Sequence, residues 1–196
     1  MLDLIRWNEP SLWKSIACIL FNPIAWNIVA RREHRTRFLT KLCGGPYQGC
    51  YVLAFLIFTM GLFRDYLYKN AIEHQPTLDL LGNPLIKAIG GTCIFFGAIL
   101  VVSSTWKLGI TGTFLGDYFG ILMNERVTSF PFNVVENPMY TGSTLNFLGT
   151  AIWYQCPAGL LLTLLVHVMY QIALQYEGPF TAKIYEARSK NEKKQS

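Results

Sequence analysis

An unbroken apolar run, from about residue 140 to residue 176, constrains the fold of this chain more than any other feature. As one helix, its roughly 37 residues would rise about 55 Å, whereas the hydrocarbon core of a bilayer is about 30 Å thick. Two helices of about 18 residues fit that thickness if the chain turns near Gln155-Cys156-Pro157, because proline cannot continue the first helix. The run therefore predicts a helical hairpin whose two ends lie on the same side of a membrane.

Three shorter apolar segments precede this run, at about residues 12–30, 47–63 and 85–106, and the second stops at Arg64-Asp65. Only 15% of the residues are charged, against roughly 25% in soluble domains. Proline kinks a membrane helix without excluding it, so the first segment, with Asn22-Pro23, either spans the membrane or re-enters as a wedge. We predict an all-α fold, a polytopic membrane bundle of about five transmembrane helices.

The net charge of +5 gathers in residues 31–41 and after Lys183. With five spans, twelve Lys and Arg residues lie on the side that holds residues 111–143, and five lie on the other side. The positive-inside rule assigns the twelve to the cytosol. Basic residues beside spans also contact anionic lipid, and we favour this role over nucleic-acid binding.

The remaining composition suggests one domain without a metal centre. The five cysteines have no spacing typical of a disulfide framework or a zinc site, so we expect reduced thiols. The N-terminus has no pattern of a cleavable signal peptide, so we expect the first apolar segment to stay. We interpret residues 1–196 as a single membrane domain, with N-terminal helices (1–84), a cofactor-binding core (85–185) and a basic tail (186–196). The sequence assigns no oligomeric state.

Residues 111–143, TGTFLGDYFGILMNERVTSFPFNVVENPMYTGS, are polar and rich in glycine between apolar segments. Long loops of this kind are usually functional or disordered, and this stretch holds too many aromatic residues for disorder. We therefore expect a folded site at a membrane surface. Asn137 precedes a proline and is pushed out of the helical region, while Pro138 suits the first turn of the hairpin. Glu177 stands where the hairpin returns to this side; such a boundary carboxylate is equally often a solvated helix end.

Several strings resemble a known family. GTFLGDYFGIL, RVTSFPFNVVENPMYTGS and YEGPFTAKIY resemble the phosphatidylethanolamine N-methyltransferases, and most of all their fungal members that methylate phosphatidyl-N-methylethanolamine. FNPIAWNIVARREH and CGGPYQGCY also match, so the resemblance covers about residues 21–185. The element Asn137-Pro138-Met139-Tyr140-x-Gly142 is similar to Arg-His-Pro-x-Tyr-x-Gly of the isoprenylcysteine carboxyl methyltransferases, with Asn137 replacing their histidine. This similarity implies that the C-terminal half of the chain folds like that of the isoprenylcysteine carboxyl methyltransferases.

The resemblance implies S-adenosylmethionine as the methyl donor. The family's Gly-x-Gly element maps onto Phe95-Phe96-Gly97, where only the second glycine is present, and its Glu-Glu pair maps onto Glu177-Gly178. Gly178 thus replaces the second carboxylate, and Glu177 is the stronger candidate. The other candidate cofactor-binding residues come from the central stretch and the hairpin: Gly116, Asn137, Pro138, Tyr140, Gly142 and Ser143.

The implied reaction is methyl transfer to the amines of phosphatidyl-N-methylethanolamine and phosphatidyl-N,N-dimethylethanolamine in phosphatidylcholine synthesis. An ammonium group has no lone pair, and with a pKa of about 10 its deprotonation at pH 7 costs about 4 kcal/mol. A carboxylate or imidazole can accept that proton. The candidates are Glu177, Asp117, Glu33 and His34, although for His34 an interfacial position beside basic residues is the stronger interpretation.

The lipid would enter from the bilayer and S-adenosylmethionine from the cytosol. A non-catalytic membrane scaffold or lipid-binding protein of the same fold is the alternative, and a nicotinamide-dependent reductase is disfavoured because no Gly-x-Gly-x-x-Gly follows a strand. Lys193 and Lys194 resemble a dilysine retrieval signal, a receptor-read address. We therefore expect the endoplasmic reticulum membrane, with a cytosolic C-terminus and a mitochondrial membrane as a second location.

Overall fold

The computed structural model describes residues 4–124 and 127–195, with side chains up to residue 187. These residues form helices, turns and loops without a strand. Arg126 and the basic side chains after residue 187, which enter the charge count above, lie outside this description. The helices, with two 3-10 turns, are α1 (Pro10–Thr36), α2 (Phe38–Cys43), α3 (Pro46–Glu73), η1 (Asp79–Gly82), α4 (Pro84–Thr113), η2 (Gly116–Phe119), α5 (Pro138–Trp153) and α6 (Pro157–Gln195).

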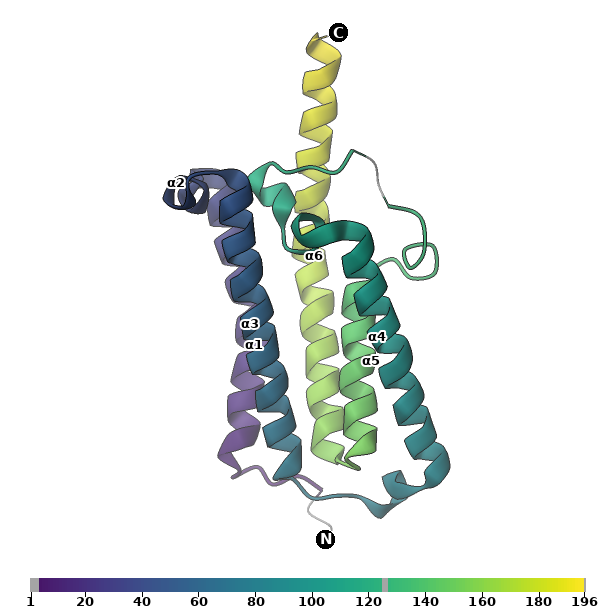
Figure 1. Cartoon of the computed structure of the whole chain (residues 1–196). Helices are drawn as coiled ribbons and strands as arrows, with labels where there is room; N and C mark the ends of the chain where they lie inside the picture. Colours follow the sequence, from purple (N-terminus) through teal and green to yellow (C-terminus); the bar gives the residue numbers. More distant parts are fainter. Residues whose placement is uncertain (1–3, 125–126, 196) are drawn as a thin grey trace.

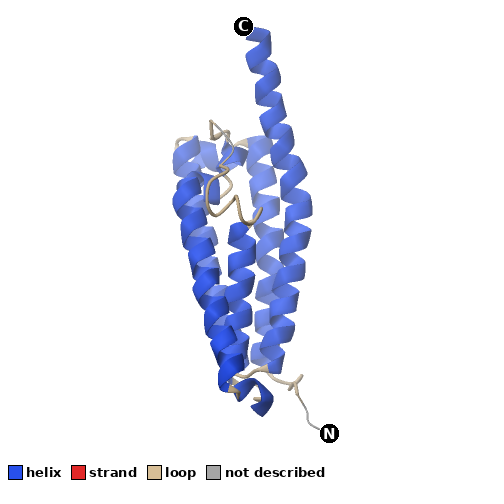
Figure 2. Ribbon diagram, turned by 90° about the vertical axis from the view of Figure 1, so that its right-hand side faces the viewer, coloured by secondary structure: helices blue, strands red, loops and turns tan. Residues whose placement is uncertain are grey.

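The five long helices lie side by side as one bundle (Figure 1). α2, η2, the loop that follows it and the end of α6 share the upper end in this view, while η1 lies at the lower end. α6 projects beyond the bundle, as the side view shows (Figure 2). α5 ends at Trp153 and α6 begins at Pro157, which confirms the predicted hairpin and places both of its outer ends at the upper end of the bundle.

Each long helix begins at a proline: Pro10, Pro46, Pro84, Pro138 and Pro157. The first turn of a helix has no intrahelical partner for its backbone N–H groups, so the N–H that proline lacks is not missed there. Asn137, directly before Pro138, has φ −125° and ψ 70°, outside the helical region. The sequence-based prediction for the start of α5 is therefore confirmed.

Within the described part of the chain, four helices are long and apolar enough to cross a membrane: α1, α3, α4 and α6. α5 has 16 residues, so it rises only about 24 Å. The protein is thus a polytopic helical membrane bundle, as predicted. The described residues give four helices of spanning length where about five were predicted, because α5 is too short to cross as a straight helix. α1 continues through Pro23 as one 27-residue helix, which favours a span over a re-entrant wedge for the first apolar segment.

α4 and α5 cross at small residues. A Cβ atom added to Gly142 would lie 2.6 Å from the carbonyl oxygen of Gly97, and one added to Gly149 would clash with the carbonyl oxygen of Gly90. Glycine on both sides therefore lets the two backbones approach closely. This crossing holds the first turn of α5 at the upper end of the bundle.

The second apolar segment stops at Arg64-Asp65 in the sequence, but its helix does not, because α3 continues to Glu73. The Arg64 side chain is only 15% exposed. Its Nη1 donates to the hydroxyl of Tyr170 at 2.6 Å, and its Nη2 lies 2.9 Å from Oδ1 of Asp65. The charged side chain is tolerated within the helix because Asp65 on α3 and Tyr170 on α6 accept its hydrogen bonds.

Candidate functional site

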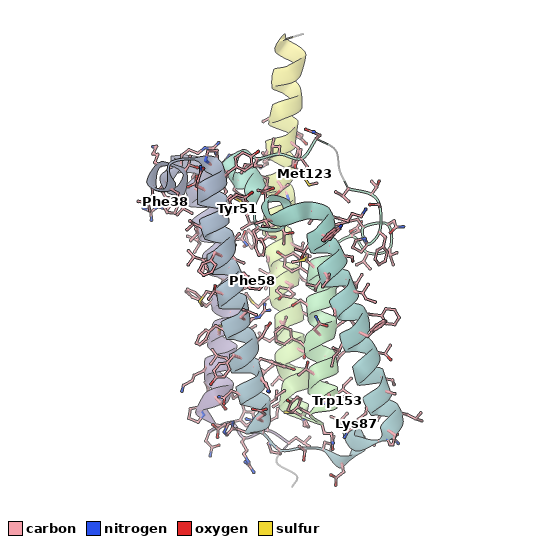
Figure 3. All side chains as sticks on the ribbon, viewed as in Figure 1. Phe38, Tyr51, Phe58, Lys87, Met123 and Trp153 are labelled. Carbon is pink, nitrogen blue, oxygen red and sulfur yellow. The ribbon has the colours of Figure 1, made fainter. Side chains whose placement is uncertain are left out.

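A cavity of about 720 Å³ lies inside the bundle. Side chains from α1, α3, α4, α5 and α6 line it, together with η2 and the loop before α5. Two of these residues are labelled in Figure 3, Phe58 on α3 and Met123 in the loop that follows η2. Its size is typical of a site for a small molecule, for which pockets range from about 300 to 1,000 Å³.

One face of α6 supplies much of the polar lining. Tyr170, Glu177, Thr181 and Tyr185 all border the cavity. They are spaced by seven, four and four residues, a periodicity that places side chains on the same helical face. The Tyr185 hydroxyl accepts a hydrogen bond from the backbone N–H of Met123 at 3.2 Å. This contact ties the loop above the cavity to α6.

The carboxylate of Glu177 joins three helices. Its Oε1 accepts a hydrogen bond from Nδ2 of Asn27 on α1 at 2.8 Å. Its Oε2 accepts one from the hydroxyl of Tyr140 on α5 at 2.6 Å. A carboxylate has about four acceptor sites, so two bonds fix its orientation and leave it able to accept from a ligand.

Asp117 places a second carboxylate in the same cavity. Its Oδ2 accepts a hydrogen bond from the hydroxyl of Thr181 at 2.6 Å, and its Oδ1 accepts one from the backbone N–H of Tyr118 at 3.1 Å. Thr181 follows Glu177 by four residues, so the two carboxylates lie about one helical turn apart along α6. η2 presents Asp117, and the residue that caps its C-terminal end is Gly120, whose φ of 82° favours glycine.

Three buried polar atoms in the lining have no hydrogen-bond partner among the described residues: Ser104 Oγ, Thr113 Oγ1 and Asn146 Oδ1. Asn27 Oδ1, on the side chain that holds Glu177, is also without a partner there. Leaving a buried polar group unpaired costs about 1–3 kcal/mol. A polar ligand bound in the cavity would supply the missing hydrogen-bond partners. The lining thus combines the carboxylates of Asp117 and Glu177 with unpaired oxygens.

The structure brings six of the predicted site residues together around this cavity. They come from η2, the start of α5 and the end of the apolar part of α6: Asp117, Asn137, Pro138, Tyr140, Ser143 and Glu177. Among the aromatic side chains near this end of the bundle, Trp26 of α1 also lines the cavity. Tyr118 instead stacks on Phe180, with ring centroids 4.9 Å apart, and Trp106 is 85% exposed.

Glu33 and His34 lie outside the cavity lining. Glu33 is fully buried and accepts hydrogen bonds from the backbone N–H of Leu39 at 2.6 Å and the hydroxyl of Thr40 at 2.5 Å. It thereby holds α2 against α1. The His34 ring packs edge-on against Phe180, with centroids 5.2 Å apart.

The glycine-containing candidates occupy other places. Phe95 and Phe96 are exposed on α4, and Gly97 packs against Gly142 at the crossing with α5. Gly116 lies in a tight turn, where a Cβ atom would come within 2.6 Å of the Thr111 carbonyl oxygen. Gly178 is exposed, and a Cβ atom there would have no neighbour within 4 Å.

Sequence reasoning missed four residues that hold or line the site: Asn27, Arg64, Tyr170 and Thr181. Two of them carried a usable signal, because Thr181 and Tyr170 lie four residues after and seven before Glu177 and so share its helical face. Asn27 had no such signal, since its contact with Glu177 joins residues 150 positions apart.

Comparison with known proteins identifies a family and several relatives that the chain matches. The family described as phospholipid methyltransferase matches residues 85–188. The phosphatidyl-N-methylethanolamine N-methyltransferase of Saccharomyces cerevisiae is 55% identical over 179 residues, which are 91% of this chain and 87% of that protein. The protein of the same name from Neurospora crassa is 53% identical, with coverage of 99% and 91%.

The phosphatidylethanolamine N-methyltransferase of Homo sapiens is 47% identical over 188 residues, which are 96% of this chain and 94% of that protein. No solved structure matches the chain. The family match includes α5, nearly all of α4 and α6 up to residue 188, with the cavity residues Asp117 and Glu177. The chain therefore belongs to the phospholipid methyltransferase family.

Proposed function

We propose that this phospholipid N-methyltransferase transfers methyl groups from S-adenosylmethionine to phosphatidyl-N-methylethanolamine and phosphatidyl-N,N-dimethylethanolamine in phosphatidylcholine synthesis. One observation carries the proposal: the Glu177 carboxylate, held by Tyr140 and Asn27, opens on a large cavity that Asp117 also lines. The names of the relatives support the choice of substrates. No observation favours the non-catalytic alternative.

The lining fits the chemistry of the methyl donor. S-adenosylmethionine supplies an electrophilic methyl group on a positively charged sulfur, and it also carries an ammonium group. Asp117 and Glu177 match these positive charges, and the unpaired oxygens of Thr113 and Asn146 can accept further hydrogen bonds. We propose that two polar lining residues at the start of α5 also hold the donor, Asn137 and Tyr140, while Ser143 lies deeper, beside Tyr170.

The other candidate residues have less direct parts in this proposal. Pro138 starts α5, Gly97 and Gly142 set the crossing of α4 and α5, and Gly116 permits the turn that presents Asp117. These residues shape the donor site through the backbone. Phe95, Phe96 and Gly178 are exposed beyond the lining, so any contribution from them is a long-range one.

Glu177 is the proposed proton acceptor for the substrate ammonium. Hydrogen bonds from Asn27 and Tyr140 hold its two oxygens in place, and positioning of the reactants supplies most of the rate. Asp117 is the second candidate acceptor, because it lines the same cavity. Glu33 and His34 support the surrounding helices in this account, through the cap of α2 and the packing on Phe180.

The lipid substrate would enter sideways, through the wall formed by α3 and α4. Phe58 and Leu62 of α3 line the cavity and are also 57% and 55% exposed. They therefore belong to the cavity and to the outer surface of a membrane-spanning helix at once. The soluble donor would enter from the upper end, under the loop that carries Met123.

The proposed location is the endoplasmic reticulum membrane, with a mitochondrial membrane as a second location. The upper end of the bundle would face the cytosol, including the tail of α6. The basic residues of α1 and α2 at that end support this orientation: Arg31, Arg32, Arg35, Arg37 and Lys41. Residues 85–185 would form the cofactor-binding core, between N-terminal helices (1–84) and a basic tail (186–196).

Calorimetric titration of S-adenosylmethionine into the purified protein in detergent tests this proposal. The protein should bind the donor, and Asp117→Asn should weaken binding about 10-fold or more, because a charge-assisted contact is lost. Asp79→Asn, at the opposite end of the bundle, is the matched control and should bind normally. Absence of donor binding would support a scaffold, and binding of a nicotinamide nucleotide instead would support a reductase.

A further inference from the structure

Arg64 is a charged residue inside a membrane-spanning helix. It lies nine residues before the end of α3, and its side chain is 15% exposed. Its guanidinium carbon lies 4.9 Å from the centre of the Phe147 ring. Ionisable residues within transmembrane segments are costly, and they usually pair with a partner or serve a function. The proposed proton transfer does not use Arg64.

Partners on the protein occupy only part of this guanidinium. Its Nε and Nη2 donate to Oδ1 of Asp65 at 3.1 and 2.9 Å, and Nη1 donates to the Tyr170 hydroxyl at 2.6 Å. These contacts use three of the five N–H donors that arginine carries. The Tyr170 hydroxyl also lies 3.0 Å from Oγ of Ser143. Arg64, Tyr170 and Ser143 together form what we call the Arg64 cluster.

The Arg64 cluster lines the same cavity as Glu177 and Asp117. On α6, Tyr170 precedes Glu177 by seven residues, which is about 10 Å along the helix axis. The ring of Tyr140, which holds Glu177, lies between the two levels, with its centroid 4.8 Å from that of Tyr170. The cavity therefore has the Arg64–Asp65 ion pair at its inner end, and the carboxylates of Asp117 and Glu177 at its outer end.

This separation of charges matches the headgroup of an amine-bearing phospholipid. Four bonds join its nitrogen to its phosphorus, which lie about 5 Å apart when extended. With a charge-assisted hydrogen bond of about 2.8 Å at each end, the headgroup spans roughly 10 Å. The polarity also agrees, because the amine is the outermost group of such a lipid and the phosphate lies closer to the acyl chains.

We propose that the Arg64 cluster binds the phosphodiester of the lipid substrate and so positions the amine beside Glu177. The guanidinium fork matches phosphate oxygens, and the Ser143 and Tyr170 hydroxyls can turn their donors toward the same anion. The inference rests on the proposed function, whose substrates carry this phosphodiester. Arg64 is then a positioning residue, which selects phospholipids over lipids with a neutral link to the amine.

Lipid binding to the purified protein tests this assignment, measured by native mass spectrometry. The two probes are phosphatidyl-N-methylethanolamine and a phosphate-free analogue, in which an ether joins diacylglycerol to N-methylaminoethanol. Arg64→Gln should lower affinity for the phospholipid about 10- to 100-fold and leave affinity for the analogue within about twofold. In methyl-transfer assays the loss should appear in KM for the phospholipid more than in kcat.

Three companion variants separate this role from folding. Arg64→Lys keeps the charge and should recover part of the lost affinity. Arg64→Gln combined with Asp65→Asn removes both charges of the pair and should reproduce the loss. Lys69→Gln removes a positive charge from the same helix at a side chain that is 58% exposed and outside the cavity, so it should bind both lipids normally.

An equal loss for both lipids, or no loss for the phospholipid, would overturn the assignment. Binding of inorganic phosphate to the lipid-free protein that Arg64→Gln abolishes, with phospholipid affinity unchanged, would also overturn it, in favour of a free anion. If the protein binds the phospholipid through Arg64 but transfers no methyl group, the proposed function fails and the Arg64 assignment stands.

Discussion

The hydroxyl of Tyr140 donates a hydrogen bond to Oε2 of Glu177 at 2.6 Å, across 37 positions of the chain. Tyr140 lies in the first turn of α5, which begins at Pro138, and Glu177 lies 20 residues into α6. The two residues meet because the hairpin returns α6 to the end of the bundle where α5 began. Asn137-Pro138 sets where α5 begins and so where Tyr140 lies, and the Tyr140 hydroxyl in turn orients the Glu177 carboxylate.

Glu177→Gln should lower kcat for methyl transfer about 100-fold or more, because general acid–base catalysis contributes about 10²- to 10⁴-fold. The amide has nearly the same shape, so the protein should stay folded in detergent. Glu186→Gln is the matched control, since Glu186 is exposed on the same helix. Wild-type kcat in the purified Glu177→Gln variant would rule out the assigned role.

Gly97→Ala should destabilise the protein by about 1–3 kcal/mol, because the added methyl group overpacks the contact with Gly142. Gly91→Ala should be neutral or slightly stabilising, since only one atom of Trp153 lies within 4 Å of the new Cβ, at 3.9 Å. Thermal unfolding in detergent compares the two. Weaker binding of the donor at unchanged thermal stability would instead support a direct cofactor role for Gly97.

The parts of this fold that depend on length and local backbone chemistry were predictable from the sequence. A run of about 37 apolar residues cannot cross a bilayer once, so the hairpin followed, and Pro138 marked its first turn. The gathering of Asp117, Tyr140 and Glu177 around one cavity followed from the same topology.

The missed features depend on contacts between distant residues. A charged pair after an apolar segment resembles the end of a membrane span. Arg64 can remain inside α3 because its guanidinium donates to the Tyr170 hydroxyl, 106 positions away in the sequence. Gly97 resembled part of a cofactor motif, while its place in the structure is set by Gly142 on the next helix. No local pattern reports such pairs.

Gly178→Glu should tighten binding of S-adenosylmethionine about twofold at low ionic strength. The new side chain would lie in open space beside Glu177, and a charge about 10 Å from the cationic donor in water contributes about 0.4 kcal/mol. Gly178→Gln is the neutral control, and salt should abolish the difference between the two. Tightening that persists at high salt would mean direct contact with the donor.

Protease treatment of sealed microsomes should remove an epitope fused after Ser196 and spare one inserted near Gly82. The end of α6 shares one end of the bundle with the basic residues of α1 and α2, whereas Gly82 lies in η1 at the opposite end. The positive-inside rule directs the basic end to the cytosol. Protection of the C-terminal epitope would overturn the orientation and the cytosolic entry of the donor together.

The most direct test of the central claim is product formation by the purified protein. The protein in mixed micelles with phosphatidyl-N-methylethanolamine and S-adenosylmethionine labelled on its methyl group should produce labelled phosphatidyl-N,N-dimethylethanolamine, followed by labelled phosphatidylcholine. Preparations of Glu177→Gln should show this label at about 1% of the wild-type level or less. Folded wild-type protein that binds both substrates and yet transfers no label to the lipid would contradict the account.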